Sequence, residues 1–188
     1  MRRSFTLVAV VLLSLGCDSQ APVTESAVTT LDIFGCEERI DYDDPNETTF
    51  HVCPGVADYQ LIVRKVGSGR KSIDVVTPDG EIYPLDLQDT VSRDMIELSD
   101  EATWRVQSTD GKLLPVAVVV GVAVRGSLDD PTKITARYHT IARIAGSESC
   151  ITTRLADNEV NAAQVEALAD KAVNQPCLPA LSGAPDPY

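Results

Sequence analysis

Histidine is scarce in this sequence, and the usual spacings of metal ligands are missing from it. The 188 residues include two histidines and five cysteines, with no C-x-x-C pair and no paired histidines. Zinc sites combine Cys and His ligands at short, regular spacings, so we expect no metal. No glycine-rich loop follows a strand and opens a helix, the arrangement that cradles phosphates. We therefore expect no cofactor and no catalytic residue.

Positive charge is also scarce. Sixteen Lys and Arg residues stand against 28 Asp and Glu residues, so the formal net charge is −12 at pH 7. Affinity for nucleic acid comes mainly from Lys and Arg side chains that meet phosphates, and a strongly acidic protein is a poor candidate for it. Nucleic acid is therefore excluded as an expected partner.

The N-terminus carries the most specific pattern in the chain. Residues 1–16 join a basic start to a short apolar segment that ends in Gly16, which is the layout of a secretory signal peptide. The ending Leu-Ser-Leu-Gly-Cys resembles the lipobox of bacterial lipoproteins, with Ser14 standing where that pattern usually has leucine. The resemblance implies that Cys17 is lipidated and becomes the first mature residue. An ordinary signal peptide cut near Ala21 is the alternative.

These patterns predict a location and a linker. The protein is expected in the bacterial cell envelope, exported and held at a membrane through its lipid, with the leaflet left open. Residues 17–34 are rich in Ser, Thr and Ala without a sustained period, and they predict a flexible tether. Loss of Arg2 and Arg3 with the leader takes the formal charge of the mature chain to −14.

Four further cysteines would reach an oxidising compartment on export. Cys36, Cys53, Cys150 and Cys177 form an even set that allows three pairings. We prefer Cys36–Cys53 and Cys150–Cys177, because each pair joins neighbours in the sequence. Structural disulfides are the usual role of such cysteines in exported proteins.

One apolar stretch organises the expected fold. Residues 115–124 are small or β-branched, too few to cross a bilayer and typical of a strand buried on both faces. Alternation gives one face made of valines at 116, 118, 120, 122 and 124. The opposite face carries Ala117, Val119, Gly121 and Ala123, so another element can approach it closely.

Alternating patterns predict six more strands, over residues 59–66, 71–77, 81–87, 103–109, 132–144 and 150–155. Residues 88–102 are ambiguous between a short helix and an acidic loop, and residues 36–47 are expected to form an acidic loop. Asp157, Asn158 or Asn161 opens a helix with an apolar stripe of Val165, Leu168, Ala169 and Ala172. We expect an α+β domain over residues 35–177, in which one antiparallel sheet of six or seven strands carries the C-terminal helix. Residues 178–188 are expected to be a disordered tail.

Several stretches of this domain resemble a family of small exported bacterial proteins of unassigned function. They are Cys-Pro-Gly-Val-Ala-Asp-Tyr at 53–59, Thr-Trp-Arg-Val with Asp-Gly at 103–111, and Cys150 followed by an Asn- and Ala-rich helix that ends at Cys177. The resemblance implies a single domain and a Cys150–Cys177 bridge. It implies no activity.

Basic residues gather in two places, which we name as possible contacts for an anionic partner. The first group is Arg64, Lys65, Arg70 and Lys71, beside a predicted hairpin turn; the second is Lys133, Arg137, His139 and Arg143, on one strand face that Arg105 could join. Candidate partners are anionic lipid headgroups, envelope glycans and an acidic protein. Basic residues on an edge hairpin also prevent sheet aggregation, which is the alternative.

The leading functional hypothesis is a non-catalytic envelope lipoprotein whose disulfide-linked domain binds a protein or polymer. Inhibition of a secreted hydrolase, such as lysozyme, is the second hypothesis, and it rests on architecture alone. An enzyme of unrecognised type is the third.

Overall fold

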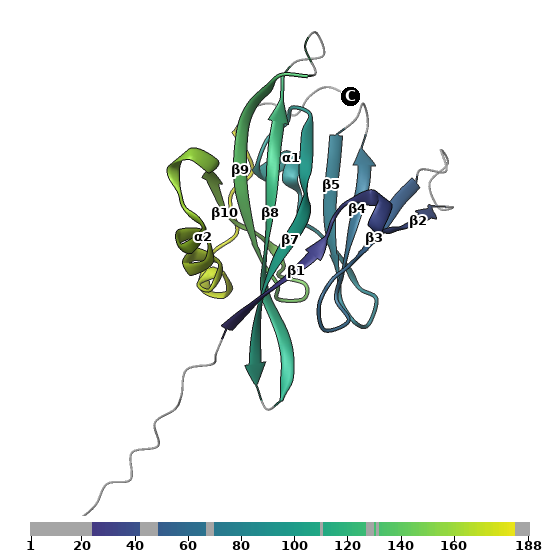
Figure 1. The fold of residues 1–188 in the computed structure, drawn as a ribbon, viewed down its shortest axis with the longest axis vertical. Helices are drawn as coiled ribbons and strands as arrows, with labels where there is room; N and C mark the ends of the chain where they lie inside the picture. Colours follow the sequence, from purple (N-terminus) through teal and green to yellow (C-terminus); the bar gives the residue numbers. More distant parts are fainter. Residues whose placement is uncertain are drawn as a thin grey trace, which may run out of the picture.

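The computed structural model describes residues 24–41, 49–66, 70–109, 111–126, 130 and 132–182, with only the backbone of Val66 and Arg70. The predicted leader and Cys17 lie outside these residues. In these described residues, ten strands form two antiparallel five-stranded sheets, which lie beside each other in the view of Figure 1 and share one core. The first sheet has the order β1 (Thr24–Thr30), β7 (Ile96–Thr109), β8 (Lys112–Arg125), β9 (Ile134–Arg143) and β10 (Cys150–Ala156). The second has the order β2 (Glu37–Ile40), β3 (Thr49–Pro54), β4 (Gln60–Val66), β5 (Arg70–Val76) and β6 (Ile82–Pro84).

The expected α+β class holds, but the single sheet of six or seven strands is wrong. All seven predicted strands exist, as β4 to β10. The three strands that were not predicted are β1, β2 and β3. The ambiguous residues 88–102 divide between the helix α1 (Leu87–Thr90) and the first half of β7. In the expected acidic loop, Glu37–Ile40 is strand β2, all of it exposed, whereas residues 42–48 lie outside the description.

Strand β1 corrects the predicted tether. Residues 24–30 pair with Glu101–Gln107 of β7 along their whole length. The indole Nε1 of Trp104 also donates a hydrogen bond of 2.9 Å to Oγ1 of Thr29. Residues 24–30 can be largely polar because β1 is an edge strand. Backbone hydrogen bonds to β7, rather than buried side chains, hold it in the sheet.

The main core lies between the two sheets. The valine face of β8 contributes Val118, Val120, Val122 and Val124, which meet Leu61, Val63, Ile73 and Val75 of the second sheet. Trp104 is completely buried among them. Side chains from both sheets fill one continuous cluster, so the alternation seen in the sequence places half of each strand in the core.

The helix α2 (Ala162–Ala169) covers the opposite, small-residue face of the first sheet, as predicted. Val165, Ala169 and Ala172 of the stripe contact Ala117, Val119 and Ile141 in a second apolar cluster. Asn161 caps the helix by accepting a hydrogen bond of 3.0 Å from the backbone of Gln164, whose side chain binds back to Asn161. This reciprocal capping box fixes where the helix begins. In the described part of the chain, no helix has the length and apolar character needed to cross a membrane.

Both predicted disulfides are present. Cys36–Cys53 links the start of β2 to β3, and Cys150–Cys177 joins β10 to the segment after α2. The expected disordered tail over residues 178–188 is wrong for residues 178–182. The backbone N–H of Leu178 donates to Ile151 O at 2.8 Å, and that of Leu181 donates to Asp89 O at 2.6 Å. Residues 178–182 are therefore docked on the domain, and residues 183–188 lie outside the description.

Candidate binding surface

The outer face of the first sheet has a covered half and an open half. Helix α2 covers the half that contains Ala117 and Val119. Beyond the helix, Gly121 and Ala123 continue the small face of β8 and form the floor of a hollow of about 390 Å³. A second hollow of about 410 Å³ shares Ile134, Arg137, Tyr138 and Asp157 with it. Because they share these residues, the two hollows form one shallow surface. It includes Gly121 and Ala123, the small residues of β8 that the sequence analysis identified.

Two walls border this hollow. Glu97, Ser99 and Asp100 of β7 form one wall, and Arg137 and His139 of β9 form the other. The bulge in β7 between Leu98 and Ala102 gives the first wall its shape. Its Asp100 carbonyl accepts hydrogen bonds from the backbone N–H of Leu31 and Asp32, at 2.7 and 3.2 Å. The turn after β1 therefore holds the bulge in place.

Ser99, His139 and Asp157 have the residue types of an acyl-transfer triad, but their contacts differ from one. The Ser99 hydroxyl donates to Glu101 O at 2.7 Å and accepts from the N–H of Gly121 at 3.0 Å. The imidazole Nε2 of His139 lies 2.8 Å from Oδ1 of Asp157. A general base must reach the proton of its nucleophile, and here that proton is committed to a carbonyl. The serine thus supports the bulge.

Charges on the hollow are mostly paired. Glu97 forms an ion pair with Arg125, and this hydrogen bond raises the pKa of Arg125 above its ordinary value. Asp157 pairs with His139. Among the described residues that line the hollow, Asp100 and Arg137 are the charged groups whose side chains have no hydrogen-bond or ion-pair partner. They stand on opposite walls, so a ligand could meet one charge of each sign.

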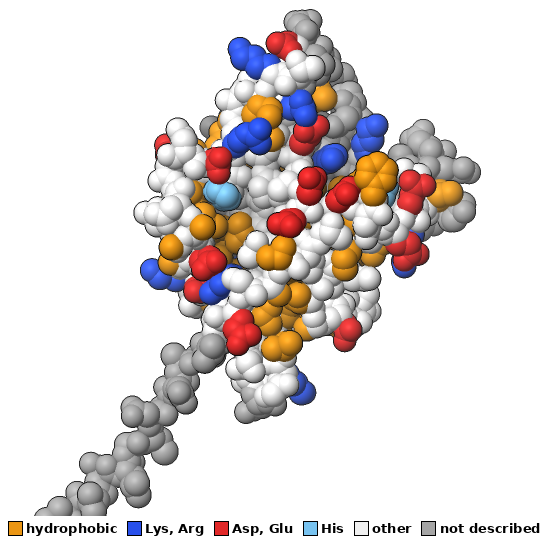
Figure 2. Space-filling view, viewed as in Figure 1, with side chains coloured by type: hydrophobic (Ala, Val, Ile, Leu, Met, Phe, Trp, Pro, Cys, Tyr) orange, Lys and Arg blue, Asp and Glu red, His pale blue; other side chains and the backbone are white. Residues whose placement is uncertain are grey.

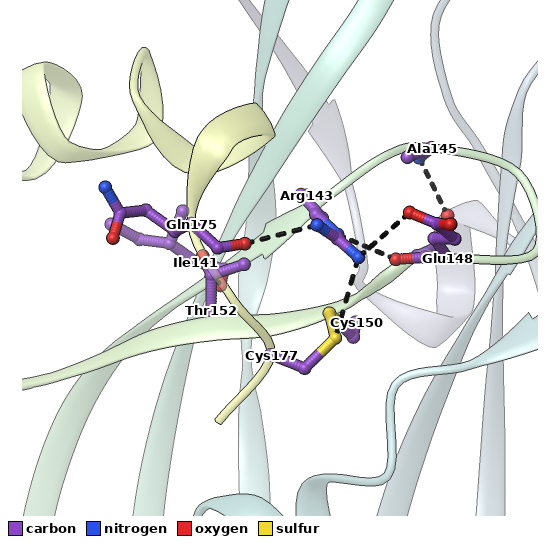
Figure 3. The surroundings of a disulfide bond; sticks show 9 residues. Ile141, Arg143, Ala145, Glu148, Cys150, Thr152, Gln175 and Cys177 are labelled. Atoms are coloured by element: carbon purple, nitrogen blue, oxygen red, sulfur yellow. Dashed lines mark hydrogen bonds and ion pairs between the residues drawn. A yellow bond between two sulfur atoms is a disulfide. The ribbon is translucent and has the colours of Figure 1, made fainter. Parts of the chain in front are cut away.

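The second predicted basic group is only partly assembled. Lys133, just before β9, and Arg137, within it, are exposed, and His139 is half-buried beside Asp157. Arg143 lies at the far end of the strand, where it donates to the carbonyls of Glu148 and Gln175 next to the Cys150–Cys177 bridge (Figure 3). Its role there is to hold the segment after α2 against the sheet.

Arg105 does not join the basic face. It lies under α2 and is buried, with its guanidinium paired to both carboxylate oxygens of Asp170 at 2.7 and 3.1 Å. Ser26 and Glu166 complete its surroundings. Asp170 is 65 residues away from Arg105 in the sequence, so the residues around Arg105 do not reveal this partner. Alternation along the strand alone suggested that Arg105 could join the open basic face.

The first basic group is neutralised in part. Arg64 lies 2.7 Å from Asp74 and 3.3 Å from Asp41, with its guanidinium over the ring of Phe50. Lys65 and Lys71 stand opposite each other across β4 and β5, and the side chain of Arg70 lies outside the description. Two lysines side by side repel each other, which suits the alternative role of opposing sheet aggregation better than a binding site.

Charges of both signs are mixed on the face of the molecule that Figure 2 presents. Figure 2 shows Lys and Arg side chains interspersed with Asp and Glu side chains over the face it presents. Within the described ranges, no group of three or more His, Cys, Asp or Glu residues is placed to hold a metal ion. The sequence did not single out Glu97, Asp100 or Asp157 as binding residues, because their neighbourhood depends on the bulge and on the turn after β10.

Known proteins offer no guide to this surface. A comparison of the chain with protein-family models, curated proteins and solved structures found no match.

Proposed function

We propose that the protein is an exported bacterial envelope protein, anchored by a lipid on Cys17, whose domain binds a protein partner without catalysis. The observation that carries the binding proposal is the hollow on the first sheet, with the unpaired charges of Arg137 and Asp100 on opposite walls. Charges of both signs complement a protein segment better than a uniformly anionic lipid surface or glycan. The shallow shape suits a macromolecule, since small-molecule sites are usually enclosed.

The test of this proposal is capture of the partner from the native envelope by cross-linking and mass spectrometry. We expect Arg137→Glu to reduce capture at least about tenfold, because reversing a charge at a close contact costs several kcal/mol. Lys171→Glu is the matched control, since this exposed lysine lies after α2 and makes the same change in net charge. Equal capture of one partner by both variants would remove the hollow from consideration. Acylation of Cys17 is measured separately, as the mass of the mature N-terminal peptide.

Inhibition of a secreted hydrolase is the second candidate, and one observation favours it. Phe34 is 93% exposed on the 3-10 turn η1 (Ile33–Gly35), immediately before the Cys36–Cys53 bridge. Asp32 accepts a hydrogen bond of 3.2 Å from the N–H of Phe34 and fixes this turn. A rigid, protruding aromatic side chain is a common anchor in protein interfaces.

Phe34→Ala tests the inhibitor function. If the protein inhibits lysozyme, this change should weaken inhibition by at least about tenfold, the range of an interface hot spot. The unfolding midpoint should stay unchanged, because the ring has little contact to lose. Ile82→Ala, on exposed strand β6, is the control. Failure of the wild-type protein to inhibit at near-stoichiometric ratio would contradict this function.

A further inference from the structure

The end of the β7–β8 hairpin exposes two large apolar side chains. Leu113 is 59% exposed and Leu114 is 50% exposed. They follow one another in β8, so they point to opposite faces of the hairpin, and neither face is covered there. Figure 1 shows this hairpin extending beyond the neighbouring strands. Adjacent exposed leucines at a protruding end usually mark a surface that is covered in the working protein.

The strand register brings the N-terminus to the same end. Thr24, the first residue of β1, pairs with Gln107, and Gln107 pairs with Leu114. Neighbouring strands lie about 4.8 Å apart, so Thr24 is about 10 Å from Leu114. Cys17 is seven residues before Thr24, and seven residues span at most about 25 Å. A lipid on Cys17 would therefore keep this end of the hairpin close to the bilayer.

We propose that the hairpin end formed by Lys112, Leu113 and Leu114 inserts into the interfacial region of the membrane and orients the domain on it. This inference rests on the lipid anchor of the proposed function. Apolar side chains flanked by a basic residue are the usual composition of a membrane-surface contact, and the ammonium of Lys112 suits anionic headgroups. Glu25, on β1 near the same end, opposes this attraction, so burial of the two leucines has to dominate.

The orientation has a consequence for the hollow. β8 runs from Lys112 at the proposed membrane end to Arg125 beside the hollow. The eleven residue steps from Leu114 to Arg125 rise by about 35 Å in a strand. With the hairpin end at the bilayer, Arg137 and Asp100 would face away from the lipid, toward a partner in the aqueous space.

Leu114→Trp in the acylated, full-length mature protein tests the proposal. The protein is reconstituted into vesicles of phosphatidylcholine and phosphatidylglycerol, with or without brominated acyl chains that quench tryptophan. Interfacial side chains lie about 5–10 Å deep, so we expect at least about twofold quenching of the added emission. The emission of the buried Trp104 is subtracted with the wild-type protein. Ile82→Trp, at a site 45% exposed in the second sheet, should show no quenching.

Two outcomes contradict the proposal, and an unacylated Cys17 would move the test to the hairpin alone. Equal emission of Leu114→Trp with and without bromine would show that the hairpin stays in water. A blue shift without vesicles, together with a dimer in sedimentation, would assign the leucines to a second copy of the chain. If Cys17 proves unacylated, the anchor fails, and the hairpin is tested alone by co-sedimentation of the mature chain with the vesicles. Leu113→Ser with Leu114→Ser should then reduce the bound fraction at least about tenfold, and equal binding would contradict insertion.

Discussion

Replacing Gly55 with alanine should destabilise the native fold more than any other change proposed for this protein. A Cβ atom at this position would lie 2.3 Å from the carbonyl oxygen of Tyr59 and 2.9 Å from the ring of Trp104. The first contact is with backbone in a tight turn, where Ala57 and Asp58 have φ angles of 50° and 65°. The turn cannot move away without displacing β4. We expect a loss of more than about 4 kcal/mol, a large part of a typical stability of about 5–15 kcal/mol.

Urea unfolding followed by circular dichroism measures this effect. Gly121→Ala is the control, because its Cβ would meet only the side chain of Ser99, at 3.1 Å. The Cβ and Oγ atoms of Ser99 must move by a few tenths of an ångström, but no backbone atom lies within 4 Å, so a loss of about 1–2 kcal/mol is expected. An unfolding midpoint of Gly55→Ala equal to that of the wild type would contradict the close packing of Gly55 against Tyr59 and Trp104.

Removing the carboxylate of Asp170 should cause the second largest loss of stability. Asp170→Ala leaves the guanidinium of Arg105, 9% exposed, without its main partner. Loss of one partner from a buried ion pair costs about 3–5 kcal/mol. Asp170 itself is 38% exposed, so water can solvate part of the charge, and we expect a loss of about 2–3 kcal/mol.

A double-mutant cycle separates the stranded charge from lost packing. Adding Arg105→Met to Asp170→Ala should recover most of the stability, because an apolar chain needs no counter-ion under α2. Glu37→Ala breaks the exposed pair with Arg39 and should leave the stability unchanged within experimental error. A double variant as unstable as Asp170→Ala would show that the cost lies in the helix and not in the charge.

The local sequence pattern was sufficient for seven strands and the helix α2, whereas β3 was missed although it buries Val52 and Cys53. The two faces of β8 were predicted correctly, because valine at every second position marks the core and small residues mark the helix contact. The stripe on α2 has the same origin. The disulfide pairs also followed from sequence neighbourhood, since each closes a loop of 17 or 27 residues. These features depend on interactions within short segments.

Other features depend on partners that are distant in the sequence. The polar residues of β1 have no alternation to reveal a strand, and their partner β7 lies about 75 residues further along the chain. The division into two sheets likewise could not be predicted, because alternating strands fit one sheet or two equally well. The hollow needed the bulge in β7, whose residues 99–101 carry no distinctive pattern.

The place of β1 at the edge of the first sheet determines when it can fold. The ribosome makes this strand first, yet the segment that it pairs with follows only after the whole second sheet has been made. β7 and β8 are joined by a short turn, so they can form a hairpin early, at little entropic cost. The free edge of β7 in that hairpin can then pair with β1. β1 is therefore synthesised first but pairs late. A partly folded domain would lack β1, the strand nearest its N-terminus.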